Sequence, residues 1–125
     1  MCIRDRDIAA LIKSADITKG KRLSNKCAAC HNFEKGKGTK VGPDLWGIVG
    51  RKKANVAGFS YSKAMASKGG DWSYQDLFHF IHKPHKFIPG TKMSFAGLAK
   101  VQEVADIIVF LHSLSDKPAP LPEDG

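Results

Sequence analysis

The 125-residue chain suits one domain with a buried core, and its 42% hydrophobic and 26% charged residues exclude disorder throughout. No run approaches the roughly 18 consecutive apolar residues of a membrane-spanning helix, and residues 1–11 lack the apolar stretch of a signal peptide. The net charge of +8 could attract nucleic acid, anionic lipid or an acidic protein, but the lysines are scattered from Lys13 to Lys117, which disfavours a nucleic-acid-binding protein.

The beginning of the chain looks foreign to the rest. Met1–Arg6 resembles translated sequencing adaptor, and Cys2 stands apart from the other two cysteines. We therefore interpret residues 1–14 as a non-native or linker remnant, and we expect residues 15–115 to form the folded domain. Residues 116–125 are rich in proline and should form an extended, solvated tail. On this interpretation the natural N-terminus, with any signal peptide or membrane anchor, is missing from the sequence.

The first half of the domain predicts two helices separated by a long loop. Asp16 is a suitable N-cap, and small or apolar residues follow it at helical spacing, which predicts a helix over 17–30. From Asn32 to Ser60 glycine and proline recur without a sustained period, so this stretch should be loop. Ser62 can cap a short helix over 63–68.

The second half predicts two further helices. Ser73 with Asp76 three residues later marks the start of a helix over 74–82, which Pro84 should end. Residues 84–97 read as a second loop. From Lys100 onward the apolar residues form the broad stripe of a helix with a buried face: Val101, Val104, Ile107, Ile108, Phe110, Leu111 and Leu114. No strand-like alternation is long enough for a sheet, so the predicted fold class is all-α.

Residues 27–31 form a C-x-x-C-H motif. On a helix, two cysteines three residues apart lie on one face, so that both thiols can add to the vinyl groups of one haem. His31 then lies beside the iron as a proximal ligand. The motif predicts one covalently attached haem c.

Two other uses of a C-x-x-C pair lack their context here. A zinc site needs two further ligands at matching spacing, and the chain has no second C-x-x-C. A thioredoxin-like site follows a strand, whereas Lys21–Lys26 is polar and reads as helix.

A second axial ligand would distinguish an electron carrier from a ligand-binding or catalytic haem protein. Met93 follows Pro89 and Gly90, which favour an extended strap that can lie across a flat cofactor. Met65 reads as a core residue of a short helix. The three histidines spaced by three residues are interpreted as solvated or half-buried helix residues, because Pro84 interrupts their register: His79, His82 and His85.

The sequence closely resembles the class I cytochromes c of mitochondria and bacterial respiratory chains, from about Asp16 to Ser115. Besides residues 27–31, the resemblance is carried by four segments: 42–51 (GPDLWGIVGR), 58–62 (GFSYS), 88–93 (IPGTKM) and 95–97 (FAG). It implies a fold in which the first and last helices cross, with Gly20 against Phe110, and in which long loops surround the haem.

The resemblance also implies roles for single residues. His31 and Met93 would be the axial ligands, and the carbonyl of Pro43 would accept a hydrogen bond from the His31 ring. Phe95 would shield the haem face near its exposed edge. The haem propionates would be hydrogen-bonded by four residues: Arg51, Tyr61, Trp72 and Thr91.

The chain departs from the mitochondrial pattern at several positions. Phe80 replaces a tyrosine that donates to the methionine sulfur, and Met65 replaces an asparagine that bonds a propionate. Ser24 replaces an aromatic residue in the helix crossing, which should loosen that contact. His85 stands where a lysine is common. Trp46, Phe80 and the proline-rich tail look more like the small bacterial cytochromes c that a membrane anchor, here preceding Asp7, holds at the membrane.

The predicted function is one-electron transfer through a partly exposed haem edge, without enzymatic activity. The resemblance implies a cytochrome bc-type reductase and a terminal oxidase as partners, with docking lysines at or near Lys26, Lys40, Lys86, Lys92 and Lys100. We expect a monomer in the periplasm, anchored to the inner membrane, in preference to the mitochondrial intermembrane space. The rival hypotheses are a haem peroxidase or ligand sensor with an open sixth site, and a thiol redox or zinc-binding module.

Overall fold

The computed structural model describes residues 5–28, 31–33, 45–51, 53, 61, 63, 65, 69–90 and 97–115. Its helices are α1 (Asp5–Lys13), α2 (Ile17–Leu23), α3 (Asn25–Ala28), α5 (Tyr74–His82), α6 (Pro84–Phe87) and α7 (Val101–Ser113). Within these ranges no strand occurs, so the predicted all-α class is confirmed. None of these helices has both the length and the apolar character needed to cross a membrane.

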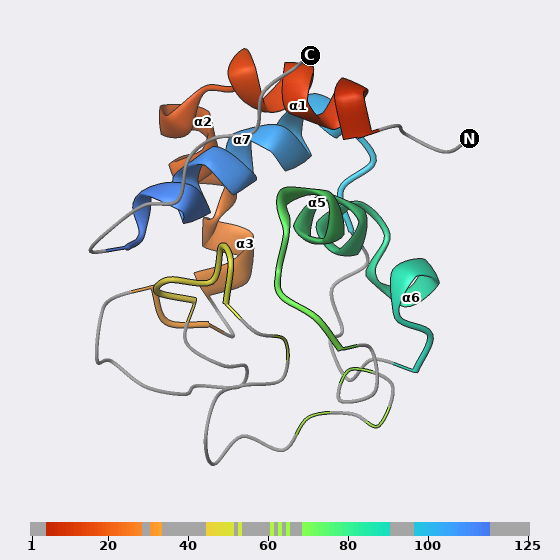
Figure 1. Cartoon of the computed structure of the whole chain (residues 1–125). Coiled ribbons are helices and arrows are strands. Elements are labelled where there is room, and N and C mark those ends of the chain that lie inside the picture. The colour runs from red at the N-terminus through yellow and green to blue at the C-terminus, as the bar shows by residue number, and fades with distance from the viewer. Residues whose placement is uncertain are drawn as a thin grey trace.

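Helices α2 and α7 cross at the predicted glycine and make the most extensive helix contact in the described part of the chain (Figure 1). A Cβ on Gly20 would overlap the backbone carbonyl of Asp106 and lie 3.1 Å from the Cβ of Phe110. Only glycine therefore allows the two backbones to approach this closely.

The start of α2 is held by two carboxylates. Asp16 is the N-cap, and its Oδ1 accepts hydrogen bonds from the backbone N–H groups of Thr18 and Lys19 at 2.9 and 3.2 Å. The buried Asp106 of α7 in turn accepts one from the Asp16 backbone N–H at 2.8 Å. The predicted cap is confirmed, and α7 fixes its position.

The predicted helix over 17–30 is interrupted at Ser24, which separates α2 from α3. The Ser24 hydroxyl donates to the carbonyl of Lys21 at 2.5 Å. The Cys27 N–H donates to the Ser24 carbonyl at 2.8 Å, which closes a tight i→i+3 turn. A serine hydroxyl that bonds a nearby carbonyl competes with the helical ladder, which explains the break. Residues 29 and 30 lie outside the described part.

A hollow of about 430 Å³ lies beside the crossing, next to Ser24. Its lining is mainly apolar and consists of Lys21, Ser24, Asn25, Ala28, Phe33, Trp46, Phe110 and Leu114. The rings of Phe33 and Phe110 meet edge to face there, with centroids 5.7 Å apart. The looser contact expected at position 24 stays a prediction.

Filling the hollow should stabilise the protein. We expect Ser24→Phe to raise the free energy of unfolding by about 1 kcal/mol, because burying the ring contributes about 2 kcal/mol and losing the hydroxyl's hydrogen bond costs about 1 kcal/mol. Urea denaturation of the haem-loaded protein measures this. Ser24→Ala is the control, since it removes the hydroxyl without filling the space. A Phe variant no more stable than the Ala variant would contradict the prediction.

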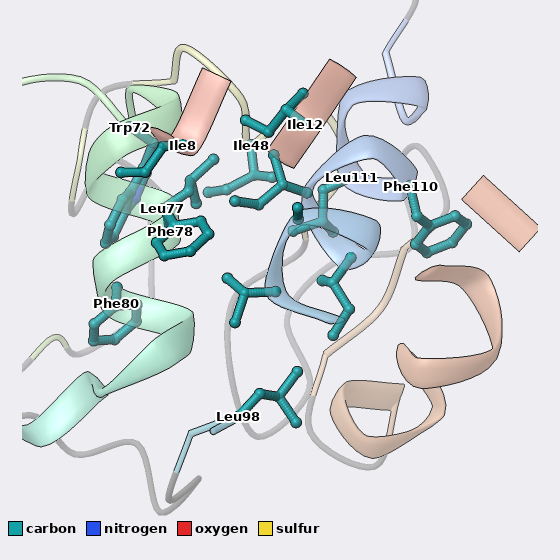
Figure 2. Packing of buried hydrophobic residues seen from close by; sticks show 14 of the residues in the cluster. Ile8, Ile12, Ile48, Trp72, Leu77, Phe78, Phe80, Leu98, Phe110 and Leu111 are labelled. Carbon is teal, nitrogen blue, oxygen red and sulfur yellow. The ribbon is translucent and has the colours of Figure 1, made fainter. Parts of the chain in front are cut away.

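Helix α1 has no counterpart in the sequence prediction, which assigned no element before Asp16. Its Ile8 and Ile12 are almost completely buried and belong to the main hydrophobic cluster, as Figure 2 shows. The helix packs against α5 and α7. Residues 5–13 therefore cover part of the core, while residues 1–4 lie outside the described part.

Helix α5 has the predicted bounds, and Ser73 caps it by accepting the Asp76 N–H at 3.1 Å. Its Leu77, Phe78 and Phe80 are buried. Tyr74 packs near His112 of α7, with ring centroids 6.3 Å apart, and burial raises the pKa of its hydroxyl. The expected end before Pro84 is confirmed.

The expectation of continuous loop over 84–97 is wrong at its beginning, because α6 occupies Pro84–Phe87. Proline is compatible with the first turn of a helix, where its missing N–H would have no helical acceptor.

The last predicted helix is confirmed as α7, whose buried residues include Val104, Ile107 and Ile108. Of the predicted helix over 63–68, only Lys63 and Met65 are described, both helical. Most of the predicted loop over 32–60 and the tail from 116 lie outside the described part.

Candidate functional site

A backbone hydrogen bond joins Cys27 to His31. Cys27 is a half-buried residue of α3, and the His31 backbone N–H donates to the Cys27 carbonyl at 2.9 Å. This contact holds the backbone of His31 close to that of Cys27, beyond the end of α3 at Ala28. Cys30 lies outside the described residues.

The chemistry of this pair fits haem attachment. A thiol and a nearby imidazole can supply one thioether and one axial ligand to the same cofactor, and apolar side chains such as Phe33 and Leu45 follow in the described chain.

Two further predicted site residues, Arg51 and Trp72, lie next to each other in the structure. We call the region formed by Gly50, Arg51 and Trp72 the Trp72 corner. The Trp72 N–H donates to the Arg51 carbonyl at 2.8 Å, and the Gly50 N–H donates to the Trp72 carbonyl at 2.8 Å. The Trp72 ring is buried against Phe80, with centroids 5.3 Å apart. Arg51 is half-buried, and its guanidinium donates to the Trp46 carbonyl at 3.2 Å. Backbone pairing thus places Arg51 beside Trp72, as a shared role requires.

Lys53 belongs to the same corner and was missed by sequence reasoning. Its ammonium is buried and lies 5.0 Å from the centroid of the Trp72 ring. In the sequence it follows Arg51 and Lys52 as one of many dispersed basic residues. Nothing in that local pattern distinguishes a buried lysine from a solvated one.

The remaining predicted site residues lie outside the described part, apart from Tyr61, which is half-buried. Those outside it are Cys30, Pro43, Thr91, Met93 and Phe95. The structure describes both flanks of the Met93 segment. Before it, Ile88 is buried and Gly90 has a φ of 88°.

After the segment, Gly97 has a φ of 101°, and a Cβ there would overlap the carbonyl of His82. A contact of 2.6 Å joins His82 Nδ1 to the Leu98 carbonyl, and the Leu98 N–H donates to the Ile81 carbonyl at 3.2 Å. The chain is therefore fixed against the end of α5 just beyond the Met93 segment. His79 and His82 are half-buried and His85 is exposed, which confirms their interpretation as helix residues.

Comparison with known proteins assigns the family. A family model described as "Cytochrome c" matches residues 17–115. A "Cytochrome c homolog" of Bradyrhizobium diazoefficiens is 49% identical over 116 residues, covering 92% of this chain and 63% of that protein. The cytochrome c of Arabidopsis thaliana is 44% identical over 106 residues, covering 84% of this chain and 95% of that protein.

The fold comparison agrees. The structure of cytochrome cH from Methylobacterium extorquens superposes with a TM-score of 0.74 at 37% identity, covering 79% of this chain and 99% of that one. The chain spans less than two thirds of the length of the Bradyrhizobium relative. Proteins of this family bind haem c covalently, which agrees with the attachment motif at residues 27–31. The family match over most of the chain, the relatives and the shared fold show that this chain belongs to the cytochrome c family.

Proposed function

We propose that this chain carries single electrons along a respiratory chain, from a cytochrome bc-type reductase to a terminal oxidase, and is not an enzyme. Proteins of the cytochrome c family are haem-based electron carriers. The observation that carries the proposal is the backbone hydrogen bond that holds His31 close to Cys27, within a chain that matches the family over residues 17–115.

The proposal assigns His31 and Met93 as the two axial ligands. When bound, haem supplies a one-electron couple, and a methionine thioether favours a high reduction potential. Pro43 would orient the His31 ring by accepting its N–H, and Phe95 would shield the cofactor from water. The match of the family model over residues 17–115, which include His31 and Met93, supports this assignment.

The residues in the corner near Trp72 would meet the propionates. Trp72 is buried and Arg51 and Tyr61 are half-buried, so donors from these residues could satisfy carboxylates that are costly to bury unpaired. Thr91 would add a fourth donor from the Met93 segment.

Positive charge on the surface supports acidic protein partners. Of the five lysines that match or neighbour the family's docking ring, Lys26, Lys86 and Lys100 are described, and all three are exposed. Such charges raise the rate of encounter with an acidic face and lose their effect as salt rises.

We propose that the protein is a monomer in the periplasm, tethered to the inner membrane through an N-terminal anchor. Cell fractionation with the full-length gene tests this location.

An absorption spectrum of the oxidised haem-loaded protein tests the carrier function. We expect a low-spin spectrum with the weak charge-transfer band of a methionine sulfur bound to ferric iron. A high-spin spectrum would overturn the proposal and favour a haem enzyme or a ligand sensor. Haem staining of a denaturing gel tests the covalent attachment, since only covalently bound haem survives the detergent.

A further inference from the structure

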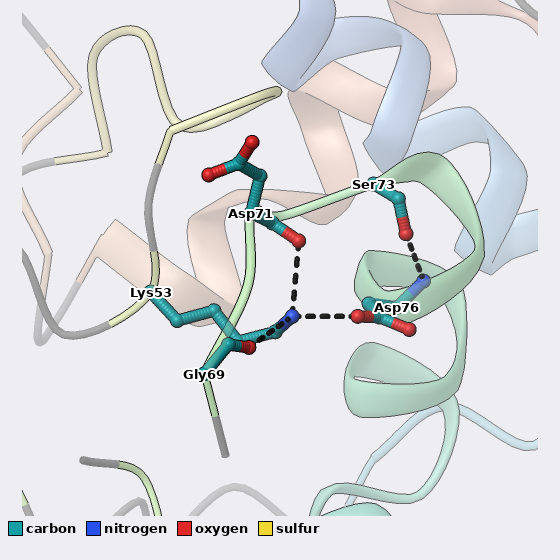
Figure 3. Close-up of polar contacts among 5 residues, drawn as sticks. All are labelled: Lys53, Gly69, Asp71, Ser73 and Asp76. Atoms are coloured by element: carbon teal, nitrogen blue, oxygen red, sulfur yellow. Dashed lines mark hydrogen bonds and ion pairs between the residues drawn. The ribbon is translucent and has the colours of Figure 1, made fainter. Parts of the chain in front are cut away.

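Lys53 is a buried lysine whose three N–H donors all have acceptors. Its Nζ lies 3.1 Å from the carbonyl oxygen of Gly69, 2.9 Å from that of Asp71 and 2.6 Å from Asp76 Oδ2 (Figure 3). The side chain is only 2% exposed. An ammonium can remain charged at such a position only when its hydrogen bonds compensate for lost hydration.

The acceptors come from two parts of the chain, the turn before α5 and the first turn of α5. Gly69 and Asp71 precede Trp72, whereas Asp76 lies in the first turn of α5. A backbone hydrogen bond also links Lys53 to the turn before α5, since the Lys53 N–H donates to the Gly70 carbonyl at 2.9 Å. Lys53 therefore connects the segment containing Arg51 to the turn before α5 and to α5 itself.

The ammonium also contacts the Trp72 indole, whose centroid is 5.0 Å away. A cation near the face of a tryptophan ring is attracted by its π electrons. The position of the ring is thus determined by Lys53, by Phe80 and by the backbone hydrogen bonds to Gly50 and Arg51.

We propose that Lys53 is a positioning residue that holds Trp72 and Arg51 in place and thereby keeps the reduction potential of the haem high. This inference rests on the proposed function, in which those two residues meet the propionates. Releasing the corner would admit water to the haem. Water stabilises the more highly charged ferric state, so the potential would fall.

The competing explanation is that the charge of Lys53 itself raises the reduction potential. Altering Asp76, the ion-pair partner of Lys53, distinguishes this charge effect from a positioning effect. At 2.6 Å the ammonium and the carboxylate form a neutral unit, whose field at a distance is weak. Removing only the Asp76 charge would raise the potential if charge dominated, because a nearby anion stabilises ferric iron. Removing it should lower the potential if Asp76 acts by holding Lys53.

The experiment compares Lys53→Met, Asp76→Asn and the double variant with the unaltered haem-loaded protein. The control is Lys19→Met, which makes the same charge change at an exposed position of α2. We expect the potential to fall in all three test variants and to stay nearly unchanged in the control. Hydrogen exchange at the Gly50 and Trp72 amides should become about 10- to 100-fold faster in Lys53→Met, the effect of losing hydrogen bonds to a charged group.

The outcomes decide between position, charge and a structural role. A higher potential in Asp76→Asn, or a normal potential in the double variant, would overturn the proposal in favour of charge. Faster hydrogen exchange with unchanged reduction potentials would overturn the proposal, because Lys53 would then only stabilise the fold. If Lys53→Met does not fold, Asp76→Asn still decides by the sign of its shift, since its Lys53 retains two carbonyl acceptors. A high-spin spectrum of the unaltered protein would refute the proposed carrier function, whereas these comparisons would still measure the action of Lys53.

Discussion

Replacing Gly20 by valine is expected to lower the free energy of unfolding by about 3 kcal/mol and the melting temperature by roughly 10 °C. The new Cβ would overlap the Asp106 carbonyl in the most extensive helix contact of the described structure. Helices α2 and α7 would have to separate, which would also strain the hydrogen bond between Asp106 and the backbone of Asp16. Thermal denaturation of the haem-loaded protein, followed by circular dichroism, measures the effect.

Thr18→Val is the matched control for this substitution. It places the same β-branched side chain in the same helix at an exposed position, so it should change the stability by less than about 0.5 kcal/mol. Equal losses in the two variants would mean that valine destabilises α2 irrespective of its contact with α7, and the close approach of α2 and α7 would then not explain the glycine.

The helices that could be predicted are those with local signals at both the ends and the faces. Ser73 and Asp76 mark the start of α5, and the apolar stripe of α7 continues over three turns. Both signals depend on residues within one helix, so a single sequence contains them. The crossing at Gly20 could be predicted from the family resemblance, although its tight contact depends on the Asp106 backbone.

The elements that escaped prediction depend on distant partners or on a competing hydrogen bond. Ile8 and Ile12 are spaced as on a helix face, but only the surface formed by α5 and α7 gives that face something to cover. The break at Ser24 arises because one hydroxyl bonds the carbonyl of Lys21. Neither feature changes the apolar periodicity from which helices are predicted.

The residues of the candidate site likewise divide into those that a local sequence pattern predicts and those that depend on distant contacts. The C-x-x-C-H motif is recognisable because covalent attachment needs its residues at neighbouring positions, and a backbone hydrogen bond joins His31 to Cys27 in the structure. The burial of Lys53 depends on acceptors at Gly69, Asp71 and Asp76, which converge only in the folded chain. A local sequence pattern therefore could not distinguish Lys53 from the solvated lysines.

Replacing Met93 by alanine is expected to have the largest effect on function. The ferric protein should lose the methionine charge-transfer band and become high-spin, and its reduction potential should fall by on the order of 0.1 V or more, since axial ligands set haem potentials over a range of about 0.8 V. The opened coordination position should also accept small ligands. Absorption spectroscopy and a redox titration measure these changes.

Met65→Ala is the matched control for this variant. Met65 is the chain's other internal methionine, and it packs at the edge of the hydrophobic cluster. Its replacement should reduce stability through lost packing while leaving the charge-transfer band in place. If the band disappeared with Met65 and survived the loss of Met93, the ligand assignment would be reversed. The Met93 segment has the stronger case because residues 88–93 resemble the methionine segment of the family, and the contacts of Leu98 with His82 and Ile81 tie the chain just beyond it to the end of α5.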